Sequence, residues 1–158
     1  MKNKIITILM AVVACAGAAI FLYIKMTKRI KRWYRIAVKN ELLFRVAARW
    51  AEMESSGKKI SDYIIQRGYK KVAIYGYGTL GEHLYAVLSK SDVGVACVIE
   101  RKADEKINLI EICKPDEIHQ NFDAIIVTAI GNYDEIKEEM ETKVSCPIIS
   151  LEDLVYEE

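Results

Sequence analysis

The chain has 158 residues and a mass of 18.0 kDa, 52% of its residues are hydrophobic, and its formal net charge is +1. This length suits one domain, and the composition excludes a disordered chain. The charge is unevenly distributed: residues 1–40 carry nine Lys and Arg and no acid, whereas the rest carries 14 Lys and Arg against 22 Asp and Glu. A net-negative body excludes nucleic acid as an expected partner, and the basic first quarter indicates a membrane.

The first expected element is a transmembrane helix. The stretch from Ile5 to Ile24 has no charged residue over 20 positions, which as a helix is long enough for a hydrocarbon core of about 30 Å. We therefore expect an anchor at residues 1–27 that contacts the lipid bilayer. The alternative is a lipoprotein or a cleaved signal, because Val12 to Cys15 resembles a lipoprotein box. The apolar run continues past Cys15, however, and this favours a retained anchor.

The charges that flank this stretch predict its orientation. Seven Lys and Arg follow it between residues 25 and 39, against Lys2 and Lys4 before it. Because positive residues stay on the cytoplasmic side, we expect a single-pass protein of the cell membrane with its amino terminus outside and its C-terminal domain in the cytoplasm. The four cysteines form no CxxC pair and no metal-ligand spacing, so we expect buried thiols, no disulfide and no metal.

An amphipathic helix is expected next, at residues 28–55. Its apolar residues recur at intervals of three and four, with Lys, Arg and Glu between them. The later half, from Leu43 to Met53, is expected to pack on the globular domain or on a second copy of itself, which would give a homodimer. Residues 54–59 break the pattern and indicate a hinge.

From residue 60 the chain alternates between short apolar runs and helical patterns. Ser61 and Asp62 are expected to cap a short helix that extends to Arg67. The expected strands lie at Val72–Tyr75, Val93–Ile99, near Ile107–Ile112, at Ala124–Ala129 and at Pro147–Ile149, and a polar helix is expected at Tyr133–Glu141. Strands without polar alternation are typical of a parallel sheet covered on both faces. The sequence therefore predicts an α/β fold at residues 60–158, a doubly wound Rossmann-like sheet of order 3-2-1-4-5.

A glycine motif lies between the first strand and the helix that follows it. It comprises Gly76, Tyr77, Gly78, Thr79, Leu80 and Gly81. In such a motif the first glycine permits a tight turn, the second lets a phosphate approach the backbone, and the third lets the helix lie against the strand. Phosphate would then face the amides at the start of the helix. The sequence therefore predicts a nucleotide site at this turn.

Two further positions are expected to complete this site. Glu100 lies 24 positions beyond Gly76, at the end of the second strand, where a carboxylate can accept from ribose hydroxyls. Arg101 beside it leaves the choice between a 2′-hydroxyl and a 2′-phosphate open, and hence the choice between NAD and NADP. Thr128, Gly131 and Asn132 follow the fourth strand and are expected to line the ligand crevice. Gly131 and Asn132 could instead form a left-handed turn.

The domain resembles a known family in four segments: VAIYGYGTLGEHLY, VGVACVIE, DAIIVTAI and CPIISLEDLVYE. These are similar to the small Rossmann modules associated with bacterial surface-glycan and sugar-nucleotide enzymes, of the nucleoside-diphosphate-sugar epimerase-like type. The resemblance covers about residues 60–158. It implies a nucleotide-sugar or NAD(P) as ligand, and membrane-associated glycan-synthesis proteins as partners. Such modules often carry an aspartate where this chain has Glu100.

Three functions are compatible with these features. The first is a membrane-tethered accessory or sensor module that binds a nucleotide or nucleotide-sugar. The second is a small membrane-bound NAD(P)-dependent oxidoreductase or epimerase-like enzyme, for which Tyr133 and Lys137 have the Tyr-x-x-x-Lys spacing of short-chain dehydrogenases. Their context differs from that of such enzymes, and His83 and His119 have no nucleophile near them in sequence. The third is a Rossmann fold that serves only as an interaction platform.

Overall fold

The computed structural model describes residues 2–101, 111–119 and 121–157, and within the first helix it leaves the side chains of residues 2, 3, 5, 7–9 and 11–14 undescribed. The chain divides into two compact units, Met1–Glu41 and Leu42–Glu158. The helices are α1 (Lys2–Ser55), α2 (Ile60–Gln66), α3 (Thr79–Leu88), α4 (Tyr133–Glu141) and α5 (Leu151–Tyr156), with a 3-10 turn η1 (Ile130–Asn132). The strands are β1 (Lys71–Tyr75), β2 (Gly94–Ile99), β3 (Ile112–Cys113), β4 (Ala124–Val127) and β5 (Ile148–Ser150).

The prediction of a transmembrane anchor is wrong. Across the described residues, no helix is both long enough and apolar enough to cross a membrane. A span needs about 20 consecutive apolar residues, and within the described part of α1 the apolar residues that end at Ile24 are followed directly by seven Lys and Arg between positions 25 and 39. The predicted single-pass topology, with an outside amino terminus and a cytoplasmic C-terminal domain, depends on this anchor and is therefore not supported either. The predicted anchor and amphipathic helix are instead parts of one continuous helix, α1.

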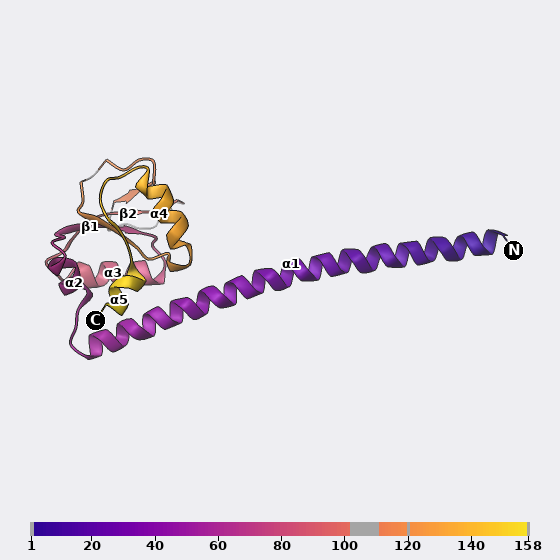
Figure 1. The fold of residues 1–158 in the computed structure, drawn as a ribbon, viewed down its shortest axis with the longest axis horizontal. Coiled ribbons are helices and arrows are strands. Elements are labelled where there is room, and N and C mark those ends of the chain that lie inside the picture. The colour runs from indigo at the N-terminus through magenta and orange to yellow at the C-terminus, as the bar shows by residue number, and fades with distance from the viewer. Residues whose placement is uncertain (1, 102–110, 120, 158) are drawn as a thin grey trace. The chain divides into compact units, whose positions relative to one another are not determined.

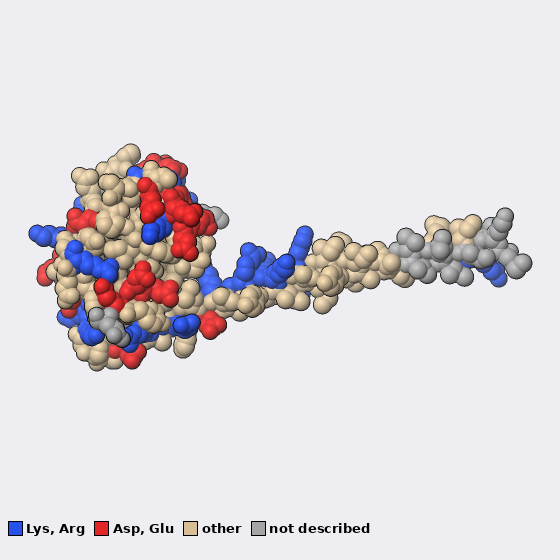
Figure 2. Space-filling model, viewed as in Figure 1, with Lys and Arg blue, Asp and Glu red and all other residues tan. Residues whose placement is uncertain are grey.

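In the first unit, the described side chains of α1 are almost all exposed. They include large apolar groups such as Phe21, Tyr23 and Trp33, and they also include the seven basic residues between positions 25 and 39. Figure 2 shows these Lys and Arg side chains gathered along one stretch of the helix. Cys15 is exposed as well, so the expectation of a buried thiol is wrong there, whereas Cys97 and Cys113 are buried.

The second unit contains the predicted sheet. Its five strands are parallel and follow the order β3-β2-β1-β4-β5, which confirms the predicted order. The third strand begins at Ile112, and residues 107–110 of the predicted strand lie outside the described residues. At the start of β1 the Asp123 carboxylate accepts from the amides of Lys70 and Lys71 at 2.7 and 2.8 Å. These bonds tie the beginning of β1 to the beginning of β4.

Both faces of the sheet are covered, as the unbroken apolar strands predict. Side chains alternate between the faces along a strand, so Val72 and Ile74 of β1 pack into one core and Ala73 and Tyr75 into another. The first core also receives side chains of α2, α3 and α5, and the second receives Ile136 and Met140 of α4. Figure 1 shows α4 on one side of the sheet and α3 and α5 on the other.

The end of α1 belongs to the first of these cores. Val46, Trp50 and Met53 are 0%, 2% and 4% exposed and pack within it. The Trp50 indole N–H donates to Oε1 of Glu54 at 2.9 Å, which satisfies the polar edge of the buried ring. The predicted packing of Leu43–Met53 on the globular domain is therefore confirmed. The core of the second unit includes residues that precede the predicted boundary at residue 60.

Removal of the Trp50 ring is expected to destabilise the second unit strongly. Trp50→Ala leaves a large cavity in the first core and should lower the free energy of unfolding by about 3–5 kcal/mol. Trp33→Ala is the matched control on the same helix, because Trp33 is 61% exposed, and it should change stability by no more than about 0.5 kcal/mol. Urea denaturation followed by circular dichroism measures both. Equal midpoints for the two variants would contradict the packing of α1.

Candidate functional site

The glycine turn lies at the carboxyl end of β1, beside the end of β4. Gly76 has φ +92°, a left-handed conformation that favours glycine. A Cβ there would also lie 3.2 Å from Oγ1 of Thr128. The Gly76 amide donates to the carbonyl of Ile99 at 2.9 Å, which ties the turn to the end of β2. The turn is therefore built at the point where the sheet order reverses direction, the place where doubly wound folds bind ligands.

Gly81 is required by close packing. A Cβ at this position would lie 2.2 Å from the carbonyl oxygen of Gly76 and 3.1 Å from Oγ1 of Thr128. The first turn of α3 can pass this close to the strand only without a side chain. Leu80 beside it is buried in the first core with Leu84 and Leu88, so the apolar stripe of α3 holds the helix in this position.

Gly78 differs from the other two glycines because the space around it is open. It is the N-cap of α3, with φ −81° and ψ −170°, and a Cβ would meet nothing within 4 Å. No side chain caps the start of the helix, and Thr79 is exposed. The first amides of an uncapped helix attract an anion. The position predicted for phosphate is therefore geometrically free.

Glu100 lies directly over the glycine turn. Its Oε2 accepts from the backbone amide of Tyr77 at 3.0 Å. The predicted ribose acceptor and the glycine loop are thus in contact, although 23 positions separate them in sequence. One carboxylate oxygen braces the loop, and the side chain is only partly buried. A hydrogen-bond acceptor with a full negative charge consequently stands beside the proposed phosphate position.

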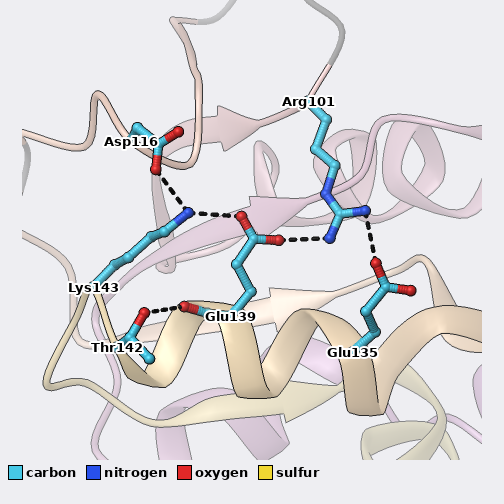
Figure 3. A network of polar contacts seen from close by, with 6 residues as sticks. All are labelled: Arg101, Asp116, Glu135, Glu139, Thr142 and Lys143. Carbon is cyan, nitrogen blue, oxygen red and sulfur yellow. Dashed lines mark hydrogen bonds and ion pairs between the residues drawn. The ribbon is translucent and has the colours of Figure 1, made fainter.

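Arg101 turns away from this acceptor and toward α4. Its guanidinium pairs with Oε1 of Glu135 at 3.0 Å and with Oε2 of Glu139 at 2.5 Å, as Figure 3 shows. The hydrogen bond that Arg101 donates to Glu139, followed by the one that it donates to Glu135, raises the pKa of Arg101 above its ordinary value. Arg101 is therefore not available to a ligand at the glycine turn, because its guanidinium is paired with Glu135 and Glu139.

Glu139 is the centre of a larger network. Its Oε1 also pairs with Lys143 at 2.6 Å, and Lys143 pairs with Asp116 at 2.8 Å (Figure 3). The hydrogen bonds from Lys143 and Arg101 hold the pKa of Glu139 below its ordinary value. The network joins Arg101, the second residue after β2, to the segment after β3 and to the helix α4 with the residue that follows it by two, Lys143. Glu135, Glu139 and Lys143 follow one another at intervals of four, but sequence reasoning did not group them with Arg101 and Asp116, which are distant in sequence.

Thr128 forms hydrogen bonds within the fold and does not present its hydroxyl to a ligand. Its hydroxyl lies 2.8 Å from the carbonyl oxygen of Gly76 and 3.2 Å from that of Tyr75, and the residue is 5% exposed. It therefore positions the glycine turn from the side of β4. Gly131 and Asn132 are exposed in η1 and neither has a positive φ, so they do not form the left-handed turn considered from the sequence.

Tyr133 and Lys137, which have the Tyr-x-x-x-Lys spacing in the sequence, are not arranged for proton transfer. The Tyr133 hydroxyl donates to the carbonyl of Ile148 at 3.0 Å, and burial raises the pKa of this tyrosine. Lys137 pairs with Glu141 at 3.9 Å. His119 is exposed in a loop, and His83 lies on the outer face of α3. Among the described residues, no group of His, Cys, Asp and Glu has the arrangement of a metal site.

The sheet order and the glycine turn at its reversal point define a Rossmann-like α/β domain. Residues 68–147 match the family model described as C2185-like, N-terminal, a match that runs from the end of α2 to the residue before β5 and covers the turn, Glu100 and Thr128. These 80 residues are just over half of the chain, and the chain belongs to this family. Comparison with curated proteins found no match, and comparison with solved structures found none either. The resemblance to epimerase-like modules stays a prediction.

The close approach of α3 to β1 can be tested at Gly81. Gly81→Ala should lower the free energy of unfolding by about 1–3 kcal/mol, because the new methyl group overlaps the Gly76 carbonyl. Gly78→Ala is the control, since it adds the same methyl group in open space, and it should change stability by less than about 0.5 kcal/mol. Urea denaturation measures both. A Gly81→Ala chain as stable as the control would refute this packing.

The charge network predicts a pH-dependent contribution to stability. The pKa of Glu139 is lower in the folded chain than its ordinary value of 4.5, so its carboxylate stabilises the fold above that value and the effect is lost as pH falls through the folded pKa. Glu139→Gln should cost about 0.5–1 kcal/mol at pH 7 and almost nothing near pH 3. Glu138→Gln, an exposed neighbour, should show no such difference. Urea denaturation at both pH values decides the matter, and a cost that persists at low pH would contradict the network.

Proposed function

We propose that this chain is a binding module for a nucleotide with a free ribose diol, such as NAD or a nucleotide-sugar, held over residues 76–81. The observation that carries the proposal is the contact between Glu100 and the amide of Tyr77 at 3.0 Å. This contact brings the Glu100 carboxylate to the loop that holds the open backbone at Gly78, and it supports a ribose acceptor beside an anion position. Neither the glycines nor the acid would support a ligand alone, since glycine turns also occur for purely structural reasons.

The phosphate half of the proposal rests on Gly78 and the start of α3. The backbone is open at Gly78 and the helix has no side-chain cap, so the first amides are available to an anion. Gly76 and Gly81 are explained by packing alone, whereas Gly78 is not. A phosphate that approaches the backbone supplies the missing reason for a glycine at this position.

The ribose half rests on charge. A ribose diol can donate to the Glu100 carboxylate, in a charge-assisted bond that is stronger than a neutral one. A 2′-phosphate at the same place would meet a negative charge, and Arg101 is already paired with Glu135 and Glu139. The arrangement therefore favours NAD over NADP, and favours nucleotide-sugars whose diol is unmodified.

A binding role is favoured over catalysis by the chain alone. The one catalytic pair that the sequence offers is Tyr133 and Lys137, and the Tyr133 hydroxyl is engaged by a backbone carbonyl. An accessory or sensor role in surface-glycan metabolism, with glycan-synthesis proteins as partners, follows from the resemblance of residues 60–158 alone. It is part of the proposal on that basis.

Calorimetric titration of the full chain with NAD, NADP and UDP-glucose tests the binding role. The parent should bind NAD or UDP-glucose and should bind NADP more weakly. Gly78→Val should abolish binding, because its side chain occupies the position of the phosphate. Glu100→Gln can still accept from the Tyr77 amide but loses its charge, so affinity for diol ligands should fall about tenfold, corresponding to about 1.4 kcal/mol. The same variant should discriminate less against NADP.

A loss of binding is informative only if the variant chains are still folded. Gly78 has negative φ and open surroundings, so Gly78→Val should unfold at the same urea concentration as the parent. Gly78→Ala provides a graded control, since its smaller side chain should cost less affinity than valine. A parent that binds none of the three ligands, or a Gly78→Val chain that binds like the parent, would show that the glycine turn serves folding only.

A further inference from the structure

Residues 23–39 of α1 carry an apolar stripe along one side of the helix. Its members follow one another at intervals of three, four, three, one, three and one residues, which places them on a single helix face. They are Tyr23, Met26, Ile30, Trp33, Tyr34, Ala37 and Val38. Thr27 lies on the same face, and its hydroxyl donates to the carbonyl of Tyr23 at 2.8 Å. This hydroxyl therefore has its partner within the helix.

The opposite face of the same helix segment is basic. Five Lys and Arg follow one another along its middle at intervals of three, four, three and four residues. They are Lys25, Lys28, Arg32, Arg35 and Lys39. Arg29 and Lys31 lie at the two borders between this basic face and the apolar stripe. Figure 2 shows the basic side chains on one edge of the helix and uncharged side chains along the opposite edge.

Among the described residues, nothing covers either face. The six large side chains of the apolar stripe are between 46% and 72% exposed, and Ala37 is exposed as well. None of the seven basic residues forms an ion pair with another described residue. Proteins rarely leave a continuous apolar surface open to water, and such a surface marks a site for a protein partner or for a membrane.

The charge of the segment selects among the possible occupants. An anionic lipid surface pairs with the basic residues, each of which strengthens binding about fivefold, and it also receives the apolar stripe. A second copy of the helix would cover the stripe, but it brings seven more positive charges, and residues 1–40 contain no acid to pair with them. Nucleic acid would pair with the basic face and leave the apolar stripe open. Of these three occupants, a lipid surface alone engages both faces.

We propose that residues 23–39 bind the surface of a bilayer that contains anionic phospholipid. The helix lies in the plane of the surface, with Ile30 and Trp33 at the boundary between headgroups and acyl chains. The long side chains of Arg29 and Lys31 reach the headgroups on its two sides. A helix bound in this way does not cross the membrane, so the proposal differs from the anchor that the structure contradicts. It is also independent of the nucleotide proposed at residues 76–81.

Flotation of the full chain with lipid vesicles tests the proposal. The anionic vesicles are phosphatidylcholine with about 30% phosphatidylserine, and the neutral vesicles are phosphatidylcholine alone. The chain should float with the anionic vesicles and bind the neutral ones at least about tenfold more weakly. Raising the salt from about 0.1 M to about 1 M shortens the screening length from about 10 Å to about 3 Å, and it should weaken binding to the anionic vesicles.

Two isoleucines of the same helix provide a matched pair of variants. Ile30 lies in the apolar stripe, whereas Ile36 lies on the basic side, four positions after Arg32 and three before Lys39. Both are exposed, and Ile→Ser costs the same helix propensity at either position. Ile30→Ser should weaken binding to the anionic vesicles about tenfold or more, and Ile36→Ser should bind like the parent. Lys28→Glu combined with Arg32→Glu should also weaken binding about tenfold or more.

Trp33 reports whether the apolar stripe leaves water. It is 61% exposed, whereas Trp50, the other tryptophan of the chain, is 2% exposed. Anionic vesicles should therefore shift the tryptophan emission of the parent to shorter wavelength. Trp33→Phe should still float with these vesicles but should show no shift, because Trp50 is already shielded from water.

Three results would overturn the proposal. The first is a parent that does not float with the anionic vesicles. The second is an equal effect of Ile30→Ser and Ile36→Ser, which would reduce the segment to a general site for polyanions. The third is a dimer in light scattering that Ile30→Ser dissociates, without flotation of the parent, which would assign the stripe to a second copy. Circular dichroism shows whether each variant is folded. Since no nucleotide is present, failure here leaves the titrations with NAD and UDP-glucose unaffected.

Discussion

The contact between Gly81 and the carbonyl of Gly76 is the constraint on which the rest of the second unit depends. A Cβ on residue 81 would lie 2.2 Å from that oxygen, so no other residue allows α3 to start so close to β1. Thr128 fixes the same carbonyl from β4 at 2.8 Å. Strand, turn, helix and neighbouring strand therefore meet at one point.

Glu100 and Arg101, two adjacent residues after β2, have different partners. Glu100 points to the glycine turn and accepts from the amide of Tyr77, whereas Arg101 points to α4 and pairs with Glu135 and Glu139. Neighbouring side chains near the end of a strand point to opposite sides, so one residue serves the site and the next serves the helix that covers the other face. This separation leaves negative charge at the turn and explains the preference for a diol that we propose.

The second unit also has a surface that its sheet does not explain. The end of α1 is bound to the first core through Val46, Trp50 and Met53, and this places Glu54 and the hinge lysines beside the outer face of α3. A groove of about 640 Å³ lies there, lined by Glu54, by residues between 57 and 65 and by residues between 83 and 92. The same helix thus stabilises the second unit through its buried face, and its last turn lines part of this groove.

The order of the sheet and the position of the glycine turn follow from the sequence alone. Apolar runs between helical patterns predict parallel strands, and crossovers of one hand leave few possible orders, so 3-2-1-4-5 is accessible without coordinates. The sequence also indicates Gly76, Gly78, Gly81 and Glu100, since motif spacing is local or nearly so. It does not show that α1 is one continuous helix, and its apolar run predicts a membrane span that the structure contradicts.

The partners of these residues emerge only from the tertiary fold. The sequence predicts Thr128 in a crevice, but this residue holds the turn. It predicts Arg101 near ribose, but Arg101 joins Glu139, Lys143 and Asp116 in one network. The groove beside α3 likewise joins segments from residue 54 to residue 92. The physical reason is that hydrogen bonds and ion pairs act over a few ångströms in space, and sequence spacing fixes such distances only within a helix, a strand or a turn.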